Sequence, residues 1–355
     1  MKNKITITIF ASFLVLNSGC DKSSGDVSIL SASQSFSSAV SKQVNSKIDI
    51  LWVIDNSYSM YPLQQSMTNN FNSFITNFVT KGFDFNMAVT TTDAYLSGSK
   101  FYNNNLYAQF RDGVGSTHTG VRVINSSTPN LVNTFVTNAS QGENGSGDER
   151  AFSSLRNALT DSLNTGFPRP GAFLAIIILS DEDDFSGDNR AEYGGADHNY
   201  SASTLDPVSS YVTFLDNLTG STDPNNRNYS VSAVAVLDNN CLASHVPNAP
   251  TAIIGQRYMT LANETKGTLA SICSNYATSL LAIQEQILEL STAYHLDRTP
   301  VVSSIQVSVN GISISQDATS GWTYDSTANS IIFHGTAIPA QGAEINVQYD
   351  PTTLL

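Results

Sequence analysis

Two apolar runs, each ending at an aspartate, place the strongest constraint on the fold of this 355-residue chain. The first is ILWVI at 50–54, followed by Asp55, and the second is AFLAIIIL at 172–179, followed by Ser180 and Asp181. A strand that is apolar throughout is typical of a sheet covered on both faces, because neither face meets water. The runs therefore predict a mostly parallel sheet between two layers of helices.

Helical and strand-like segments alternate along the chain around these runs. Apolar residues recur at helical spacing after the first run, at Leu63, Met67, Phe71, Phe74, Ile75, Phe78 and Val79, and predict one long amphipathic helix. Further strands are expected at 83–92 and 228–237, and further helices at 149–163, 206–218 and 276–290. This alternation predicts an α/β fold with a doubly wound, mostly parallel sheet.

The pattern changes to a period of two after Pro300. Apolar residues alternate on both sides of Asn310-Gly311, a dipeptide that favours a tight hairpin turn. Further strand-like segments follow around Trp322, at 331–333 and at 345–349. We therefore expect the main domain to span 47–297 and a small, β-sandwich-like, all-β module to span 298–355.

The first residues have the pattern of an export signal. Lys2 and Lys4 precede an apolar stretch at 5–16, which is too short to span a membrane permanently. The segment ends in Ser18, Gly19 and Cys20, and resembles the lipobox of bacterial lipoproteins. This resemblance implies a signal peptide at 1–19 and a lipidated Cys20. The Ser- and Gln-rich composition after that cysteine predicts a flexible tether, so the lipidated cysteine and tether are expected to span 20–46. The alternative is an ordinary secreted protein with an incidental cysteine.

Such an anchor would place the protein in the bacterial cell envelope, at the outer membrane or the cell surface. Because that compartment is oxidising, the two other cysteines, Cys241 and Cys273, are expected to form a disulfide. Two separate buried thiols are the alternative. The formal net charge of −13 argues against nucleic-acid binding, since no basic stripe is present to neutralise phosphates.

Oxygen-bearing side chains follow both apolar runs. The segment DNSYS carries Asp55, Ser57 and Ser59 at alternate positions, and Asp181 follows the second run. In open α/β sheets ligands bind at the carboxyl ends of the strands, so these side chains are expected at one edge. Carboxylates and hydroxyls are hard ligands that suit Mg²⁺ or Ca²⁺. Taken alone, however, DNSYS also fits an ordinary turn between a strand and a helix.

DNSYS resembles the D-x-S-x-S motif of von Willebrand factor type A domains, and WVIDNSYSM, VTTTDA and LSDEDD resemble bacterial surface lipoproteins built on this domain. In the family, a metal-ion-dependent adhesion site joins the motif to a threonine and an aspartate from later loops. Asp181 matches that aspartate. Ser146, in ENGSGDE, is the candidate for the threonine position, and its alternative is a plain loop serine.

The resemblance implies that Asp55, Ser57, Ser59, Ser146 and Asp181 hold Mg²⁺, with Mn²⁺ or Ca²⁺ as other candidates. A protein partner, which could lie on another cell, would complete the ion's shell with an Asp or Glu carboxylate. The neighbouring Asp183 and Asp184 are expected to be solvated acids or ligands of a separate Ca²⁺.

The expected function is adhesion or protein binding rather than catalysis. The sequence contains none of the common motifs for serine hydrolases, zinc peptidases, P-loop enzymes or dinucleotide-binding enzymes, and its histidines are scattered. The alternatives are a structural component of an envelope complex and, less favoured, a metal-dependent hydrolase that uses acids at 181–184.

Overall fold

The computed structural model describes residues 38–44, 47–187, 200 and 202–352. The predicted signal peptide, Cys20 and most of the predicted tether lie outside these residues. None of the described helices is long and apolar enough to cross a membrane.

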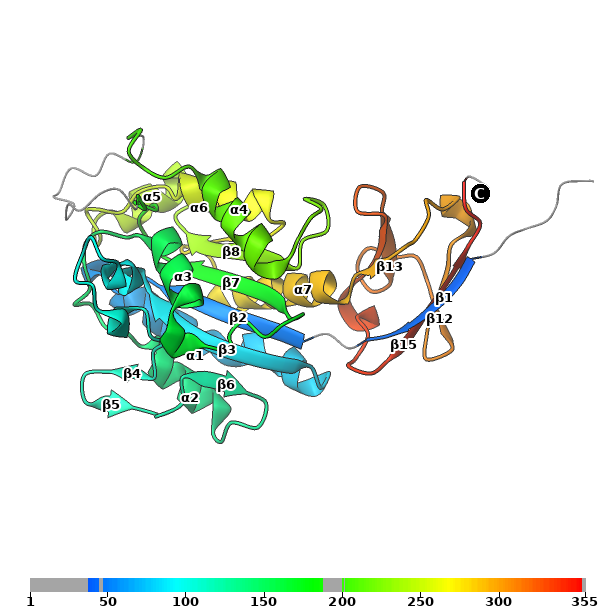
Figure 1. The fold of residues 1–355 in the computed structure, drawn as a ribbon, viewed down its shortest axis with the longest axis horizontal. Helices are drawn as coiled ribbons and strands as arrows, with labels where there is room; N and C mark the ends of the chain where they lie inside the picture. The colour runs from blue at the N-terminus through cyan, green and yellow to red at the C-terminus, as the bar shows by residue number, and fades with distance from the viewer. Residues whose placement is uncertain (1–37, 45–46, 188–199, 201, 353–355) are drawn as a thin grey trace, which may run out of the picture. The chain divides into compact units, whose positions relative to one another are not determined.

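A six-stranded sheet forms the centre of the main domain, with the strand order β6-β3-β2-β7-β8-β9. The strands are β2 (Lys47–Ile54), β3 (Asp84–Thr91), β6 (Val123–Asn125), β7 (Phe173–Leu179), β8 (Tyr229–Ala235) and β9 (Leu269–Ser271). All neighbouring pairs are parallel except β3 and β6. Figure 1 shows β2, β3, β7 and β8 side by side in this sheet.

Helices cover both faces of the sheet. One face packs against α1 (Tyr61–Thr80), α2 (Leu131–Ala139) and α7 (Tyr276–Thr292), and the other against α3 (Ala151–Thr160), α4 (Val208–Thr219) and α6 (Gln256–Glu264). A seventh helix, α5 (Asn239–His245), follows β8. The predicted α/β fold with a mostly parallel sheet is therefore confirmed.

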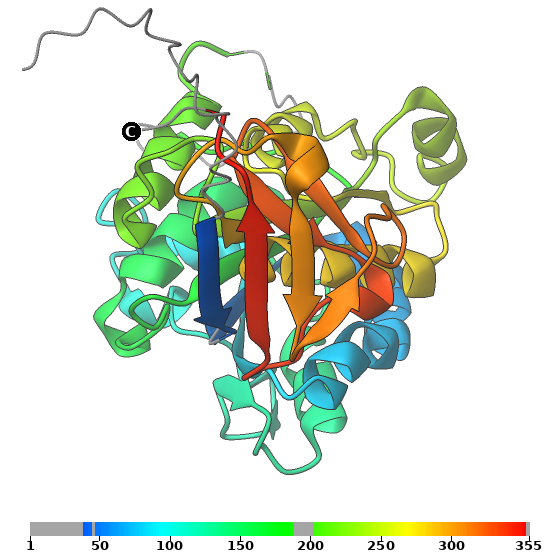
Figure 2. The same ribbon diagram turned by 90° about the vertical axis from the view of Figure 1, so that its right-hand side faces the viewer.

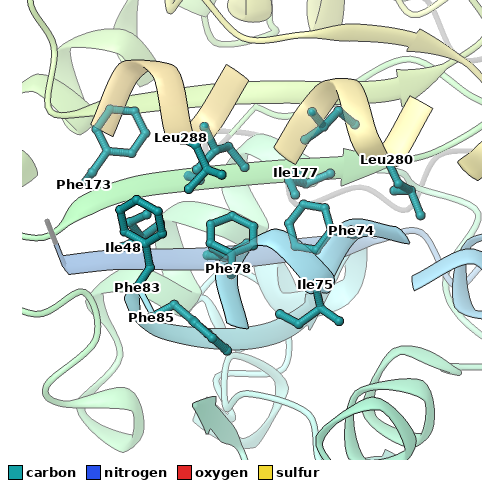
Figure 3. Close-up of a cluster of buried hydrophobic side chains, with 14 of the residues drawn as sticks. Ile48, Phe74, Ile75, Phe78, Phe83, Phe85, Phe173, Ile177, Leu280 and Leu288 are labelled. Atoms are coloured by element: carbon teal, nitrogen blue, oxygen red, sulfur yellow. The ribbon is translucent and has the colours of Figure 1, made fainter. Parts of the chain in front are cut away.

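The alternation of side chains along β2 explains why its sequence is apolar throughout. Trp52 and Ile54 belong to the cluster under α1 and α7, whereas Leu51 and Val53 belong to the cluster under α3 and α4. Figure 3 shows part of the first cluster, in which Phe74 and Phe78 of α1 lie near Leu280 and Leu288 of α7. Since both faces are buried, a polar residue can follow β2 only where the strand leaves the core.

Two small antiparallel sheets contain the remaining long-range strand pairs. One has the order β1-β15-β11-β12 and the other β10-β14-β13. Their strands are β1 (Ser38–Gln43), β10 (Tyr294–His295), β11 (Gln306–Val309), β12 (Ile312–Ile314), β13 (Trp322–Asp325), β14 (Ser330–Phe333) and β15 (Glu344–Tyr349). The predicted hairpin is confirmed, with positive φ at both Asn310 and Gly311.

The tether prediction for 20–46 is wrong in its last part. Residues 38–43 form β1, which pairs antiparallel with β15 from Ser38↔Tyr349 to Gln43↔Glu344. Figure 2 shows β1, in blue, beside β15, in red. Pairing gives the backbone groups of β15 partners on the side that β11 does not occupy. A local reading of polar composition could not reveal a partner about 300 residues away.

Short elements complete the described fold. They are β4 (Gly113–Val114), β5 (Thr117–His118) and the 3₁₀ turns η1 (Tyr58–Met60), η2 (Thr92–Ser97), η3 (Asn105–Tyr107), η4 (Ser162–Asn164), η5 (Val302–Ser304) and η6 (Gly335–Ala337). Of these, η1 matters most for the site, because it turns the chain from β2 into α1.

The N-terminal cap of α7 provides a first test of the fold. The Asn275 side chain accepts a hydrogen bond from the Thr278 backbone nitrogen at 3.1 Å. Replacing Asn275 with alanine leaves that donor without its cap, so we expect the free energy of unfolding to fall by about 1 kcal/mol. Asn275→Ser keeps a capping oxygen and should recover most of the loss. Urea unfolding of the two variants measures the difference, and equal stabilities would contradict the capping role.

Candidate functional site

The two apolar runs bring their terminal polar residues to the same edge of the sheet. β2 and β7 are parallel neighbours with Ile54 opposite Leu179, and the Asp55 backbone nitrogen donates to the Leu179 carbonyl at 2.9 Å. The Ser180 hydroxyl donates to Asp55 Oδ2 at 2.7 Å. Below, this carboxyl edge with its loops is called the rim.

The turn after β2 is folded around the Asp55 carboxylate. The Ser57 backbone nitrogen donates to Asp55 Oδ1 at 2.8 Å, and the Asp55 side chain is fully buried. Ser57 itself is nearly buried, and its hydroxyl has no hydrogen-bond partner among the described residues. A buried hydroxyl usually finds a partner, so this oxygen is a candidate to bind a ligand.

Ser59 and Asp181 connect the two predicted segments directly. The Ser59 hydroxyl donates to Asp181 Oδ1 at 3.1 Å, and Asp181 Oδ2 lies 2.9 Å from His245 Nε2 on α5. The structure therefore places Asp55, Ser57, Ser59 and Asp181 on two adjoining segments of the rim. The His245 contact was not predicted, because nothing local in the sequence links α5 to the strand end.

Ser146 lies on the neighbouring loop, but its hydroxyl is engaged elsewhere. The Gly145 backbone nitrogen donates to the Asn56 carbonyl at 2.8 Å, which holds this loop against the turn after β2. The Ser146 hydroxyl pairs with the Tyr95 hydroxyl at 3.1 Å and accepts from the Asp148 nitrogen at 3.1 Å. No described contact joins it to the four residues above.

Gly145 is required at this close approach. A Cβ at this position would lie 2.5 Å from the Asn56 side chain and 2.7 Å from the Asn56 carbonyl oxygen. Any larger residue would push the loop away from the rim.

Glu149 is the site residue that the sequence analysis missed. It is fully buried, and neither carboxylate oxygen has a hydrogen-bond partner among the described residues. Burial raises the pKa of Glu149 well above its ordinary value, and the charges of Asp55 and Glu182 raise it further. One signal could have indicated it: this acid begins the helix predicted at 149–163, next to the same rim.

Buried carboxyl groups dominate the electrostatics of the rim. Burial and the charge of Asp181 raise the pKa of Asp55 to about 8, although hydrogen bonds from Ser57 and Ser180 act in the opposite direction. Buried carboxylates are costly unless a positive group compensates them. Within the described ranges, no group of three or more His, Cys, Asp or Glu side chains is arranged to hold a metal. An ion here would therefore need hydroxyl or water ligands as well. The Ser57 hydroxyl, which has no hydrogen-bond partner among the described residues, could be one of them.

Asp183 and Asp184 are not solvated, contrary to one of the two expectations for them. Both are buried, and Asp184 accepts from Arg257 Nε at 3.1 Å and Nη2 at 3.0 Å, and from the Phe152 nitrogen at 2.9 Å. Asp183 accepts from the Arg257 backbone nitrogen at 3.0 Å. These bonds give both acids a structural role, since they tie α6 and α3 to the loop after β7.

The predicted disulfide between Cys241 and Cys273 is confirmed. It joins α5 to the segment after β9, and the same helix carries His245 to Asp181. The cross-link therefore lies close to the rim.

Comparison with known proteins gives only distant likenesses. No protein-family model matches the chain, and no curated protein matches it significantly. Among solved structures, the pilus adhesin SpaC from Lactobacillus rhamnosus GG is similar, with a TM-score of 0.42 and 13% identity over 88% of this chain and 40% of the adhesin. Proximal thread matrix protein 1 from the mussel byssus has a TM-score of 0.37 and 11% identity over 73% of this chain and 52% of that protein.

The chain spans about 40% of the length of the SpaC adhesin. Scores this low carry no argument about function. The functional proposal therefore depends on the rim itself.

Proposed function

We propose that this protein is a metal-dependent adhesion or protein-binding module of the von Willebrand factor A type, lipid-anchored to the bacterial envelope through Cys20. The observation that carries the proposal is the buried Ser57 hydroxyl, which has no hydrogen-bond partner in the part of the chain that the structure describes and belongs to the turn folded around the Asp55 carboxylate at the carboxyl end of β2. Ser59 and Asp181 adjoin it through their own hydrogen bond.

In this proposal the rim residues hold Mg²⁺, with Mn²⁺ or Ca²⁺ as other candidates. When bound, the ion supplies a positive centre for oxygen ligands. Asp55 and Asp181 provide negative charge, and Ser57 and Ser59 provide neutral oxygens. His245 and Ser180 hold the two carboxylates in orientation through the bonds described above.

The proposed partner is a protein that presents an Asp or Glu side chain, on another cell or within the envelope. Loops at the carboxyl ends of the strands would select the partner, since loops on a rigid scaffold usually carry recognition. Tyr58 lies within the D-x-S-x-S segment and is 81% exposed, so it is placed to touch whatever approaches the ion. This is a binding role without turnover.

Ion titration tests the proposal. Calorimetry with MgCl₂, MnCl₂ and CaCl₂ on the purified full chain should reveal one divalent site, and EDTA should lower the unfolding temperature of the ion-loaded protein. Attachment of the protein to whole cells should then require the ion and fail in EDTA.

Each part of this experiment separates the proposal from its rivals. Absence of ion binding at millimolar concentrations would overturn the metal-dependent function. Ion binding without ion-dependent attachment to any cell would favour a structural role in an envelope complex. Ion-dependent hydrolysis of phosphoester or glycan substrates would instead favour an enzyme.

A further inference from the structure

Glu149 stands out among the buried acids of the rim because no described donor or positively charged side chain contacts its carboxylate. Asp184 is paired with Arg257, Asp181 with His245 and Ser59, and the Glu182 carboxylate accepts from the Tyr200 hydroxyl at 3.0 Å. Glu149 is equally buried, yet neither of its carboxylate oxygens meets a donor among the described residues.

The backbone on either side of Glu149 spans the rim. At one end of the loop, the Gly145 nitrogen donates to the Asn56 carbonyl at 2.8 Å. At the other end, the Phe185 nitrogen donates to the Glu149 carbonyl at 2.7 Å. The loop is thus tied both to the turn after β2 and to the segment after β7, which carry Asp55 and Asp181.

The Glu149 side chain lies close enough to Asp55 for the two charges to interact. Among the charges that raise the pKa of Glu149, that of Asp55 has the largest effect and that of Glu182 the next largest. The Ser57 hydroxyl, also buried and without a partner, belongs to the same turn as Asp55. Two oxygen-bearing side chains without a hydrogen-bond partner among the described residues, Ser57 and Glu149, therefore lie on adjoining loops, and Glu149 is within electrostatic range of the buried Asp55 carboxylate.

A protonated Glu149 would resolve only part of the arrangement. It could share its proton with the Glu182 carboxylate, but the Ser57 hydroxyl would still have no hydrogen-bond partner among the described residues. A divalent cation satisfies carboxylate and hydroxyl oxygens together and offsets the charges of Asp55 and Glu149.

From this geometry we propose that Glu149, rather than the Ser146 hydroxyl, is the ligand that the loop before α3 contributes to a divalent cation, directly or through one water. This inference rests on the proposed function, because it concerns the same ion site. It changes the chemistry of that site: the loop contributes a charged oxygen where the family resemblance implies a neutral hydroxyl. A charged oxygen in place of a neutral one strengthens this loop's attraction for the ion.

Calorimetric titration of MnCl₂ and MgCl₂ into the full chain tests the inference with three single substitutions. Glu149→Gln keeps the size of the side chain and removes its charge, and we expect the ion affinity to fall about tenfold or more. Ser146→Ala removes the predicted ligand and should leave the affinity within about twofold of wild type. Glu143→Gln makes the same chemical change at an exposed residue of the same loop and should also leave it unchanged.

Thermal unfolding provides a readout that does not depend on ion affinity alone. Without ion, Glu149→Gln should unfold at a temperature equal to or above that of wild type, because a neutral amide of the same size replaces an acid whose ionised form is destabilised by burial. With saturating Mg²⁺, the unfolding temperature of Glu149→Gln should rise by less than that of wild type. A lower unfolding temperature without ion, together with an unchanged ion-induced shift, would overturn the inference.

The Asp55→Asn variant distinguishes failure of this inference from failure of the proposed function. If Asp55→Asn loses the ion while Glu149→Gln keeps it, Glu149 is not a ligand and the proposed function stands. If Ser146→Ala rather than Glu149→Gln loses the ion, the ligand predicted from the sequence is the correct one. If wild type binds no ion, both proposals fail.

Discussion

Asp55→Asn is expected to lower the affinity for Mg²⁺ and Mn²⁺ by about 100-fold while leaving the protein folded. The asparagine has the same shape, but it lacks the negative charge and replaces one carboxylate oxygen with an NH₂ group. Since Asp55 receives hydrogen bonds from Ser57 and Ser180, that NH₂ group would also oppose one of these donors. Calorimetric titration of the full chain measures the loss.

The stability of the ion-free variant separates loss of the ion from loss of the fold. Because burial and Asp181 raise the pKa of Asp55 to about 8, the ionised carboxylate is less stable in the folded protein than in the unfolded chain. The contribution of Asp55 to the free energy of unfolding therefore becomes more unfavourable as the pH rises from the ordinary pKa of 3.8 towards 8. Removing the charge should therefore offset much of the cost of the lost hydrogen bonds near pH 7.

Asp49→Asn is the matched control. Asp49 is also fully buried and lies on the same strand, but at the opposite end, where it accepts from Arg169 Nε at 2.8 Å. This variant should be less stable than wild type and should bind the ion with unchanged affinity. If Asp49→Asn lost the ion as fully as Asp55→Asn, the effect would be a general loss of packing. If Asp55→Asn bound the ion normally, the site would have to lie elsewhere.

The central part of the fold could be predicted from the sequence because each of its strands and helices has a characteristic pattern within a short segment. The apolar run before Asp55 and the run before Asp181 are buried on both faces, as an inner parallel strand requires. The long helix after the first run and the hairpin at Asn310-Gly311 follow equally local patterns. One member of the predicted helix face, Val79, is 52% exposed, whereas Phe78 beside it in the last turn of α1 is fully buried.

The remaining features depend on contacts between distant segments. The pairing of β1 with β15 joins residues about 300 positions apart, and residues 38–43 carry no strong apolar alternation. Asp184 looks like one acid in an exposed acidic run until Arg257 is brought beside it. In the same way, Ser146 fits the resemblance by position, but the fold turns its hydroxyl toward Tyr95 and buries Glu149 instead.

Loss of the Cys241–Cys273 disulfide is expected to lower the free energy of unfolding by about 3 to 4 kcal/mol and to weaken ion binding several-fold. The bond closes a loop between residues separated by 32 positions, and the chain-entropy estimate for a loop of this length gives that range. The effect on the ion follows from the position of α5. This helix has only seven residues, too few to be stable alone, and it carries His245 to Asp181.

Urea unfolding and calorimetric titration of the Cys241→Ser/Cys273→Ser double variant measure the two effects, and wild type treated with dithiothreitol should behave in the same way. His245→Ala keeps the disulfide but removes the contact to Asp181, so it should weaken ion binding with a smaller loss of stability. The double variant could lose stability but bind the ion as tightly as wild type. In that case the disulfide would not be needed to keep His245 of α5 against Asp181. If His245→Ala also bound the ion normally, the bond from His245 would have no part in holding that carboxylate, and the orientation of Asp181 would depend on Ser59 alone.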